Sequence, residues 1–117
     1  MGMKWQVLLD EDFAKWLSEQ ETNVRIAIAS HYNVLSVYGA MLGRPQVDTV
    51  KGSKFTNMKE LRIQCKGEPW RVLFAFDPKR RSILLVGGNK QSDKRWYDKN
   101  IPIADARFAK HLKNMEN

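Results

Sequence analysis

A set of cationic side chains ending in two aromatic residues is the part of this sequence best suited to chemistry. The cations lie at Lys51, Lys54, Arg62, Arg71, Lys90, Lys94 and Arg95, and Trp96 and Tyr97 follow at once. Cleavage of RNA by its own 2′-hydroxyl requires a base, positive charge beside the phosphate and a proton donor for the leaving 5′-oxygen. Lysine, arginine and tyrosine can supply all three without metal or histidine, provided that a cationic pocket lowers a lysine pKa. Trp96 or Tyr97 can also stack on an extruded base.

The same side chains have purely structural interpretations, which the sequence leaves open. Arg62 and Glu60 can form an ordinary ion pair between strands, and Trp96 can belong to the core. The clustered charge can be no more than a solvated basic face.

The histidines, the cysteine and the paired glycines point away from metal, cofactor and phosphate-loop chemistry. His31 and His111 are 80 positions apart and Cys65 is the single cysteine, so the spacing of zinc ligands is absent. His31 falls in the apolar stripe of a helix, which indicates packing or an interface, and Cys65 falls on the apolar side of a strand. Gly87-Gly88 is more typical of a turn at the end of a strand than of a phosphate-binding loop. We therefore expect no metal and no cofactor.

The positive charge is concentrated in the middle of the chain. The net charge is +7 over 117 residues, yet residues 1–43 carry −2, residues 44–99 carry +8 and residues 100–117 carry +1. Such asymmetry favours an acidic partner in the middle segment, with nucleic acid as the first candidate.

Hydrophobic periodicity predicts seven elements in the order β-α-α-β-β-β-α. Alternation predicts strands at 4–9, 60–66 and 70–76, and the run at 82–86 is predicted to be a strand that is apolar on both faces. Helical stripes predict helices at about 13–17, 22–42 and 103–115. Gly43 and Pro45 provide the stop of the long helix, and a basic loop is expected over 44–57. Short links between the last three strands imply an antiparallel meander.

These elements fit a single α+β domain spanning residues 1–117. Two helices close in sequence are expected to form an antiparallel hairpin on one face of the sheet, and a C-terminal helix follows. The other face is expected to stay partly open, with the cations converging on one rim of it. The sequence has no apolar run long enough to cross a membrane and no signal-peptide pattern, so we expect a cytoplasmic protein without a membrane partner.

Two long segments of the chain carry a resemblance to a known family. They are VKGSKFTNMKELRIQCKGEPWRVLFAFDPKRRSILLVGGNK at 50–90 and IPIADARFAKHL at 101–112. Together they resemble phage-derived HigB-like toxins of the RelE/ParE superfamily. The resemblance keeps its order over nearly the whole chain and implies the β-α-α-β-β-β-α fold.

The resemblance also implies a function, that of a toxin in a type II toxin–antitoxin system. Its expected partner is a small cognate antitoxin, often a helix-turn-helix protein, in a toxin–antitoxin hetero-oligomer. RelE-like members cut mRNA on the ribosome with scattered basic residues and a tyrosine, whereas ParE-like members lack that set and poison DNA gyrase. The cations and Tyr97 favour the first activity. A gyrase inhibitor without chemistry of its own and an inactive phage-derived basic domain remain alternatives.

The site of such a metal-independent endoribonuclease is assigned in two groups. Catalysis is assigned to Arg62, Arg71, Lys90, Lys54 and Tyr97. The two arginines hold the scissile phosphate, Lys90 or Lys54 acts as base or charge donor, and Tyr97 is the candidate tyrosine. RNA binding is assigned to Lys51, Lys54, Lys94, Arg95 and Trp96.

Overall fold

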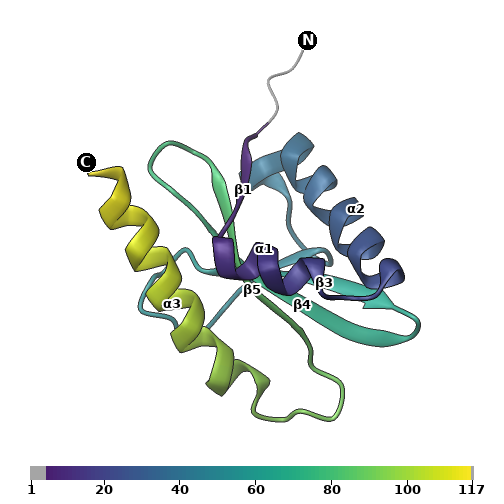
Figure 1. The fold of residues 1–117 in the computed structure, drawn as a ribbon. Coiled ribbons are helices and arrows are strands. Elements are labelled where there is room, and N and C mark those ends of the chain that lie inside the picture. The colour runs from purple at the N-terminus through teal and green to yellow at the C-terminus, as the bar shows by residue number, and fades with distance from the viewer. Residues whose placement is uncertain (1–4, 117) are drawn as a thin grey trace.

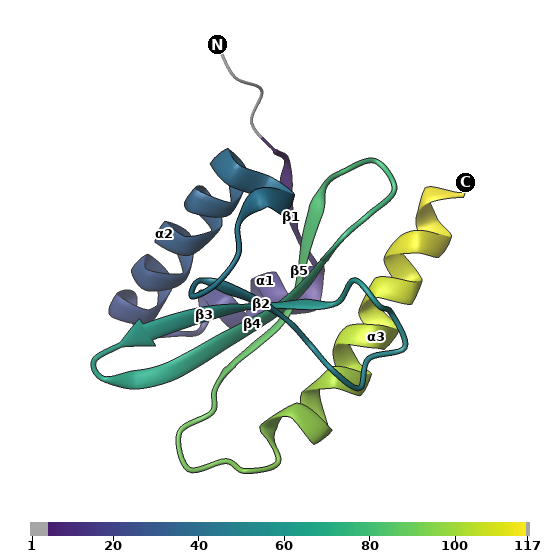
Figure 2. The same cartoon turned by 180° about the vertical axis from the view of Figure 1, so that it is seen from behind.

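The computed structural model describes residues 5–116, which form a mixed five-stranded sheet with helices on both faces (Figure 1, Figure 2). In chain order the elements are β1 (Val7–Leu9), α1 (Glu11–Ser18), α2 (Thr22–Tyr38), the short 3₁₀ helix η1 (Gly39–Met41), β2 (Val47–Thr49), β3 (Lys59–Cys65), β4 (Glu68–Phe76), β5 (Ser82–Asn89) and α3 (Trp96–Met115). The predicted α+β class and the order of the seven predicted elements are confirmed. Lys4, at the start of the predicted first strand, lies outside the described residues.

The strands lie in the order β1-β5-β4-β3-β2. β3, β4 and β5 form the predicted antiparallel meander, while β1 pairs with β5 in parallel at one edge and β2 pairs with β3 at the other. The β3–β4 turn consists of Lys66 and Gly67, whose φ angles are 53° and 76°. Two positive φ values are those of a type I′ turn, which suits a two-residue hairpin. Because this turn fixes the register, Arg62 lies directly opposite Arg71.

The largest departures from the predicted elements are at α2, α3 and β2. α2 ends at Tyr38 rather than at 42, because Gly39 adopts a φ of 55° and ends the helix. α3 begins at Trp96 rather than near 103, and Pro102 lies inside it. Within the predicted loop 44–57, Val47–Thr49 pairs with β3, and three residues are too few for alternation to reveal a strand.

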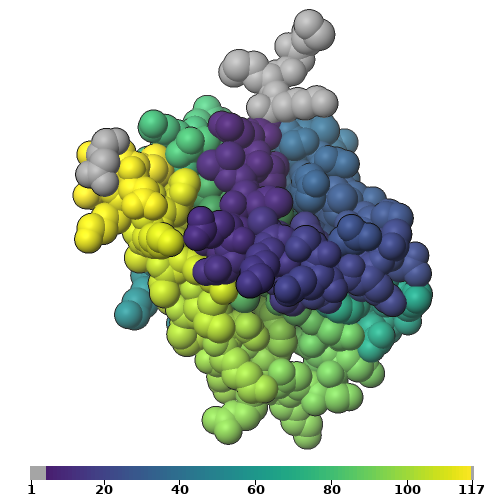
Figure 3. All heavy atoms as spheres, in the orientation of Figure 1, coloured from purple at the N-terminus to yellow at the C-terminus, as the bar shows by residue number. Residues whose placement is uncertain are grey.

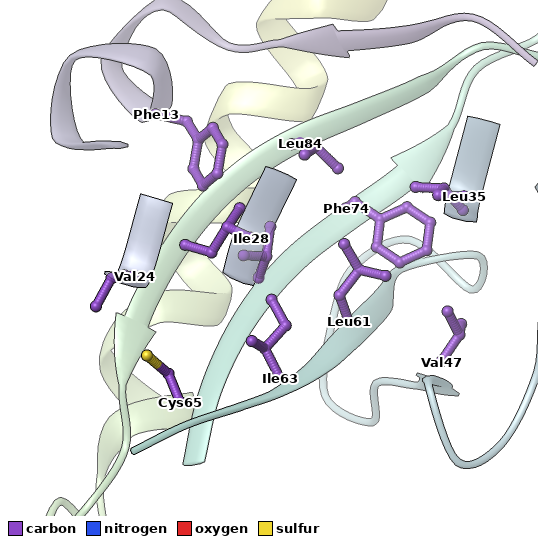
Figure 4. Close-up of a cluster of buried hydrophobic side chains, with 11 residues drawn as sticks. Phe13, Val24, Ile28, Leu35, Val47, Leu61, Ile63, Cys65, Phe74 and Leu84 are labelled. Carbon is purple, nitrogen blue, oxygen red and sulfur yellow. The ribbon is translucent and has the colours of Figure 1, made fainter. Parts of the chain in front are cut away.

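The helices α1 and α2 cover one face of the sheet, as the sequence predicts (Figure 1, Figure 3). α1 begins after Asp10, whose carboxylate accepts hydrogen bonds from the backbone N–H groups of Asp12 and Phe13. The buried apolar side chains of this layer, most of which Figure 4 labels, are Phe13, Val24, Ile28, Leu35, Val47, Leu61, Ile63, Cys65, Val72, Phe74 and Leu84. Gly87 lets the Trp16 indole reach β5, since a Cβ at residue 87 would lie 2.7 Å from that ring.

The helix α3 packs on the opposite face and covers its β4–β5 part (Figure 2). Its buried layer includes Leu73, Ala75, Ile83, Leu85, Val86, Trp96, Ile101, Ala104 and Phe108. The face that the sequence predicts to be partly open is therefore open only beside β3 and the start of α3. None of the helices described within residues 5–116 has the length and apolar character needed to span a bilayer.

Candidate functional site

Three polar side chains meet where the first turn of α3 crosses β3 and β4. The Tyr97 hydroxyl donates a hydrogen bond to Glu60 Oε1 at 2.6 Å, and Arg71 Nε lies 3.2 Å from the same oxygen. The register places Glu60 opposite Leu73 and Arg71 opposite Arg62, so Glu60 and Arg71 are diagonal neighbours on one face. The first turn of α3 places the Tyr97 side chain in contact with Glu60, beside Arg71. Tyr97, Glu60 and Arg71, called the Tyr97 cluster below, come from three separate elements.

The ion pair of the Tyr97 cluster is buried. The Glu60 and Arg71 side chains are each only 8% exposed, and Arg71 Nη1 donates to the carbonyl of Trp70 at 3.0 Å. Although Arg71 Nε is within ion-pair distance of Glu60, it forms no well-directed hydrogen bond with any group in residues 5–116. A buried guanidinium donor in this state retains capacity for a further acceptor.

Two further side chains fix the position of Tyr97. Lys90 Nζ lies 5.4 Å from the centre of the Tyr97 ring, in the geometry of a cation–π contact. Lys90 is held there because its backbone N–H donates to the carbonyl of Pro69 at 2.9 Å. The Trp96 ring meets the Tyr97 ring edge to face at 5.2 Å. The predicted catalytic residues Lys90, Arg71 and Tyr97 are therefore neighbours.

The environment of Tyr97 raises the pKa of its hydroxyl above the ordinary value of 10.0. Burial is the largest cause, followed by the hydrogen bond to Glu60 and its negative charge, while Arg71 acts in the opposite direction. Tyr97 therefore stays protonated at neutral pH and can act as a proton donor.

A groove of about 510 Å³ lies between the loop after β2 and α3. Lys51, Lys54 and Tyr97 all line it, and both lysines are exposed. The loop is held by buried Asp105 of α3, which accepts hydrogen bonds from the hydroxyl of Ser53 and, at 2.9 Å, from the backbone N–H of Lys54. The structure thus brings the predicted loop lysines to the same groove as Tyr97.

The two arginines of β3 and β4 differ in their surroundings. Arg62 is exposed, and within residues 5–116 it forms no ion pair, whereas Arg71 is paired with Glu60. The alternative in which Glu60 pairs with Arg62 is therefore wrong. Glu60 and Arg62 are two residues apart on β3. Glu60 contacts Arg71 instead, which lies diagonally across from it on β4.

The residues assigned to RNA binding just before and at the start of α3 have different positions. Trp96 is only 4% exposed and packs in the core, so its assignment to base stacking is wrong. Its indole lies under Gly88, where a Cβ would come within 2.5 Å of Nε1. Lys94 and Arg95 are exposed, and Arg95 Nε is 4.0 Å from Asp98.

The histidines and the cysteine stand apart from the Tyr97 cluster. His111 Nε2 is 2.9 Å from buried Asp77, and His31 Nδ1 is 2.8 Å from the carbonyl of Ala27. Cys65 is buried in the layer under α1 and α2. In the described range 5–116, no group of three or more histidine, cysteine, aspartate or glutamate side chains is arranged to hold a metal ion.

Sequence reasoning missed Glu60 and Asp105 as parts of the site. Alternation puts Glu60 on the polar side of its strand, which is expected to be exposed, but the early start of α3 buries it. Asp105 lies in the predicted last helix, and only the fold brings the loop after β2 to its carboxylate. In both cases the sequence offers one signal, an acidic residue near cations, but it does not show which side chain the acid contacts.

Comparison with known proteins adds relatives to this geometry. Residues 15–109 match the family described as "Phage derived protein Gp49-like". In Mycobacterium tuberculosis (strain ATCC 25618 / H37Rv), "Putative toxin HigB3" is 46% identical over 102 residues, which cover 86% of this chain and 88% of that protein. "Putative toxin HigB2" from the same strain is 42% identical over 109 residues, 92% of this chain but 54% of that longer protein. Among solved structures, an arginine-to-alanine mutant of E. coli toxin RelE in the free state is similar to this chain, with a TM-score of 0.56 and 11% sequence identity. The match covers 79% of this chain and 90% of the RelE chain, and at this identity it shows a similar fold.

Proposed function

The chain belongs to the family of phage-derived Gp49-like proteins, and we propose that it is a type II toxin that stops translation by cutting mRNA at the ribosome. The kinship with HigB-like toxins that the sequence motifs predict is confirmed. The observation that carries the proposed activity is the convergence of a half-buried tyrosine, a buried arginine and nearby lysines on one face.

The proposed reaction is attack of an RNA 2′-oxygen on the adjacent phosphorus. The bond from phosphorus to the 5′-oxygen breaks, which leaves a 2′,3′-cyclic phosphate and a 5′-hydroxyl. Tyr97, which is protonated at neutral pH, gives its proton to the leaving 5′-oxygen. The proton of the 2′-hydroxyl goes to Lys54, which lines the same groove as Tyr97, or to Lys90, which lies over the Tyr97 ring.

The charge that builds up in this reaction is negative, and the arginines are placed to stabilise it. Arg71 faces the Tyr97 hydroxyl and stabilises both the phosphate and the tyrosinate that forms, since its charge acts to lower the Tyr97 pKa. Exposed Arg62 lies across the strand pair and adds charge on the same face. Glu60 orients Arg71 and Tyr97 through the shared Oε1 atom and is a positioning residue.

The partners follow from the same proposal. The exposed lysines of the groove, Lys51 and Lys54, bind the backbone of the mRNA, and Lys94 and Arg95 extend this basic surface ahead of α3. Relatives named as toxins support a cognate antitoxin, expected to be a helix-turn-helix protein that inhibits this chain by binding it.

Mapping of mRNA 5′ ends after brief expression tests the proposal. Wild-type protein should create new 5′-hydroxyl ends inside translated codons, and Arg71→Ala should create few or none while retaining a cooperative unfolding transition. Growth arrest without new internal ends, together with accumulation of cleaved or supercoiling-altered DNA, would instead support the gyrase inhibitor.

A further inference from the structure

A second cavity, of about 490 Å³, lies at the β3 edge of the sheet beside α2. Its lining consists of His31, Pro45, Gln46, Arg62, Gln64 and Arg71. Its volume is within the range of small-ligand sites, roughly 300–1,000 Å³. Arg71 belongs both to this cavity and to the Tyr97 cluster, so the two sites are adjacent.

The cavity is suited to an anion. Arg62 and Arg71 are directly opposite each other on neighbouring strands, where two like charges are destabilising. Glu60 offsets the charge of Arg71, whereas Arg62 forms no ion pair within residues 5–116. The carboxylate nearest to its charge is that of Asp48 on β2, which is already paired with Arg44. The buried Arg71 Nε also lacks a hydrogen-bond partner in the described residues. A phosphate between the two guanidinium groups relieves the repulsion and can accept hydrogen bonds from both arginines.

The rest of the lining is suited to a nucleobase. Gln46 and Gln64 present exposed side-chain amides, and each amide offers two donors and one acceptor oxygen. Amides of this kind can pair with the hydrogen-bonding edge of an unstacked base. Gln46 is fixed beside Arg62 because the Arg62 N–H donates to the Gln46 carbonyl at 2.8 Å. The contact of His31 Nδ1 with the Ala27 carbonyl orients its ring, a flat surface on which a base can stack.

We propose that this cavity is a subsite for one nucleotide of a single RNA strand, next to the scissile phosphate. Arg62 and Arg71 hold the phosphate of that nucleotide, and Gln46 and Gln64 select its base. The inference rests on the proposed nuclease function and deepens it, because it locates sequence preference on β3 and the segment before β2. Gln46 and Gln64 are thus specificity-determining residues and take no part in bond breaking.

Binding of uncleavable RNA tests the proposal independently of catalysis. The probes are four trinucleotides with 2′-O-methyl groups, which cannot attack phosphorus, and they differ only in the central base. Isothermal titration should give one preferred base for the wild-type protein. Gln64→Leu or Gln46→Leu should weaken binding of the preferred probe at least about fivefold, as expected for loss of one paired base contact, and should change the other three much less.

The control is Gln6→Leu, an exposed glutamine directly before β1, at the far edge of the sheet. It should leave all four affinities unchanged, and thermal unfolding should confirm that every variant folds. Equal binding of the four probes by wild type, or an unchanged preference in both Gln46 and Gln64 variants, overturns the subsite even if the protein cleaves mRNA. Base-selective binding that these variants abolish, in a protein that cuts no mRNA, supports the subsite and overturns the nuclease function instead.

Discussion

Replacing Glu60 with glutamine should destabilise the protein, because it leaves the charge of Arg71 buried without a counter-charge. At 3.2 Å, the Nε–Oε1 attraction is about 5 kcal/mol for an effective dielectric constant of roughly 20, before desolvation is subtracted. Breaking a buried pair by removing one partner costs about 3–5 kcal/mol. Glutamine keeps the shape and an acceptor for the Tyr97 hydroxyl, so we expect a loss of about 3 kcal/mol in the free energy of unfolding.

Urea denaturation of Glu60→Gln, Arg71→Gln and the double variant measures this coupling. The double variant removes both charges, so it should be more stable than the sum of the single losses predicts, by about 1–3 kcal/mol. Glu21→Gln is the matched control, since Glu21 pairs with Lys66 but is 62% exposed, and it should change stability by less than about 0.5 kcal/mol. Additive losses in the double variant would refute the buried pair as the link between β3 and β4.

Three further predictions concern binding, metal and pH. Lys51→Ala and Lys54→Ala should each weaken RNA binding for all sequences. In a salt series, each variant should make the slope of log affinity against log salt concentration shallower by about 0.7. Unchanged slopes would show that the two lysines only form a solvated surface. Cleavage should be unaffected by EDTA in a ribosome-free assay, and loss of activity restored by Mg²⁺ would contradict the metal-free scheme. Burial acts to raise the pKa of Asp77, but hydrogen bonds with His111 and Arg81 outweigh it and hold the pKa below 3.8. The stability that the charged Asp77 contributes is therefore present above about pH 3.8 and is lost as the pH falls through the lowered pKa. Asp77→Asn should lower the free energy of unfolding by about 1–3 kcal/mol at pH 7 and by less in acid. Urea denaturation at several pH values measures this difference. A cost independent of pH would show that the charge of Asp77 is not what stabilises the β4–β5 turn.

The meander and the helical layer could be predicted from the sequence because their patterns are local. Alternation identifies β3 and β4, an apolar run identifies β5, and the turn at Lys66-Gly67 connects the first two of these strands. β2 could not be predicted, since its three residues pair with β3 only after the chain has folded.

The site was predicted in its residue types but not in its pairings. The cations and Tyr97 stand out by chemistry, whereas the choice of Arg71 over Arg62 as the partner of Glu60 depends on strand register. The position at which α3 starts determines the roles of the two aromatic residues, because it buries Trp96 in the core and places Tyr97 beside Glu60. Pro102 lies well inside this helix, although proline more often marks a first turn.

The most direct test of the proposed active site is single-turnover cleavage of ribosome-bound mRNA by Tyr97→Phe. Loss of the proton donor should lower the rate of the cleavage step about 100-fold or more, with RNA binding little changed. Loss of the hydrogen bond to buried Glu60 should cost about 1–3 kcal/mol of stability, which still leaves a folded protein to assay. Tyr38→Phe is the matched control, since Tyr38 is 55% exposed on α2, and it should cleave at the wild-type rate. If Tyr97→Phe cleaves as fast as the wild-type protein, Tyr97 is not the proton donor and the Tyr97 cluster is not the catalytic centre.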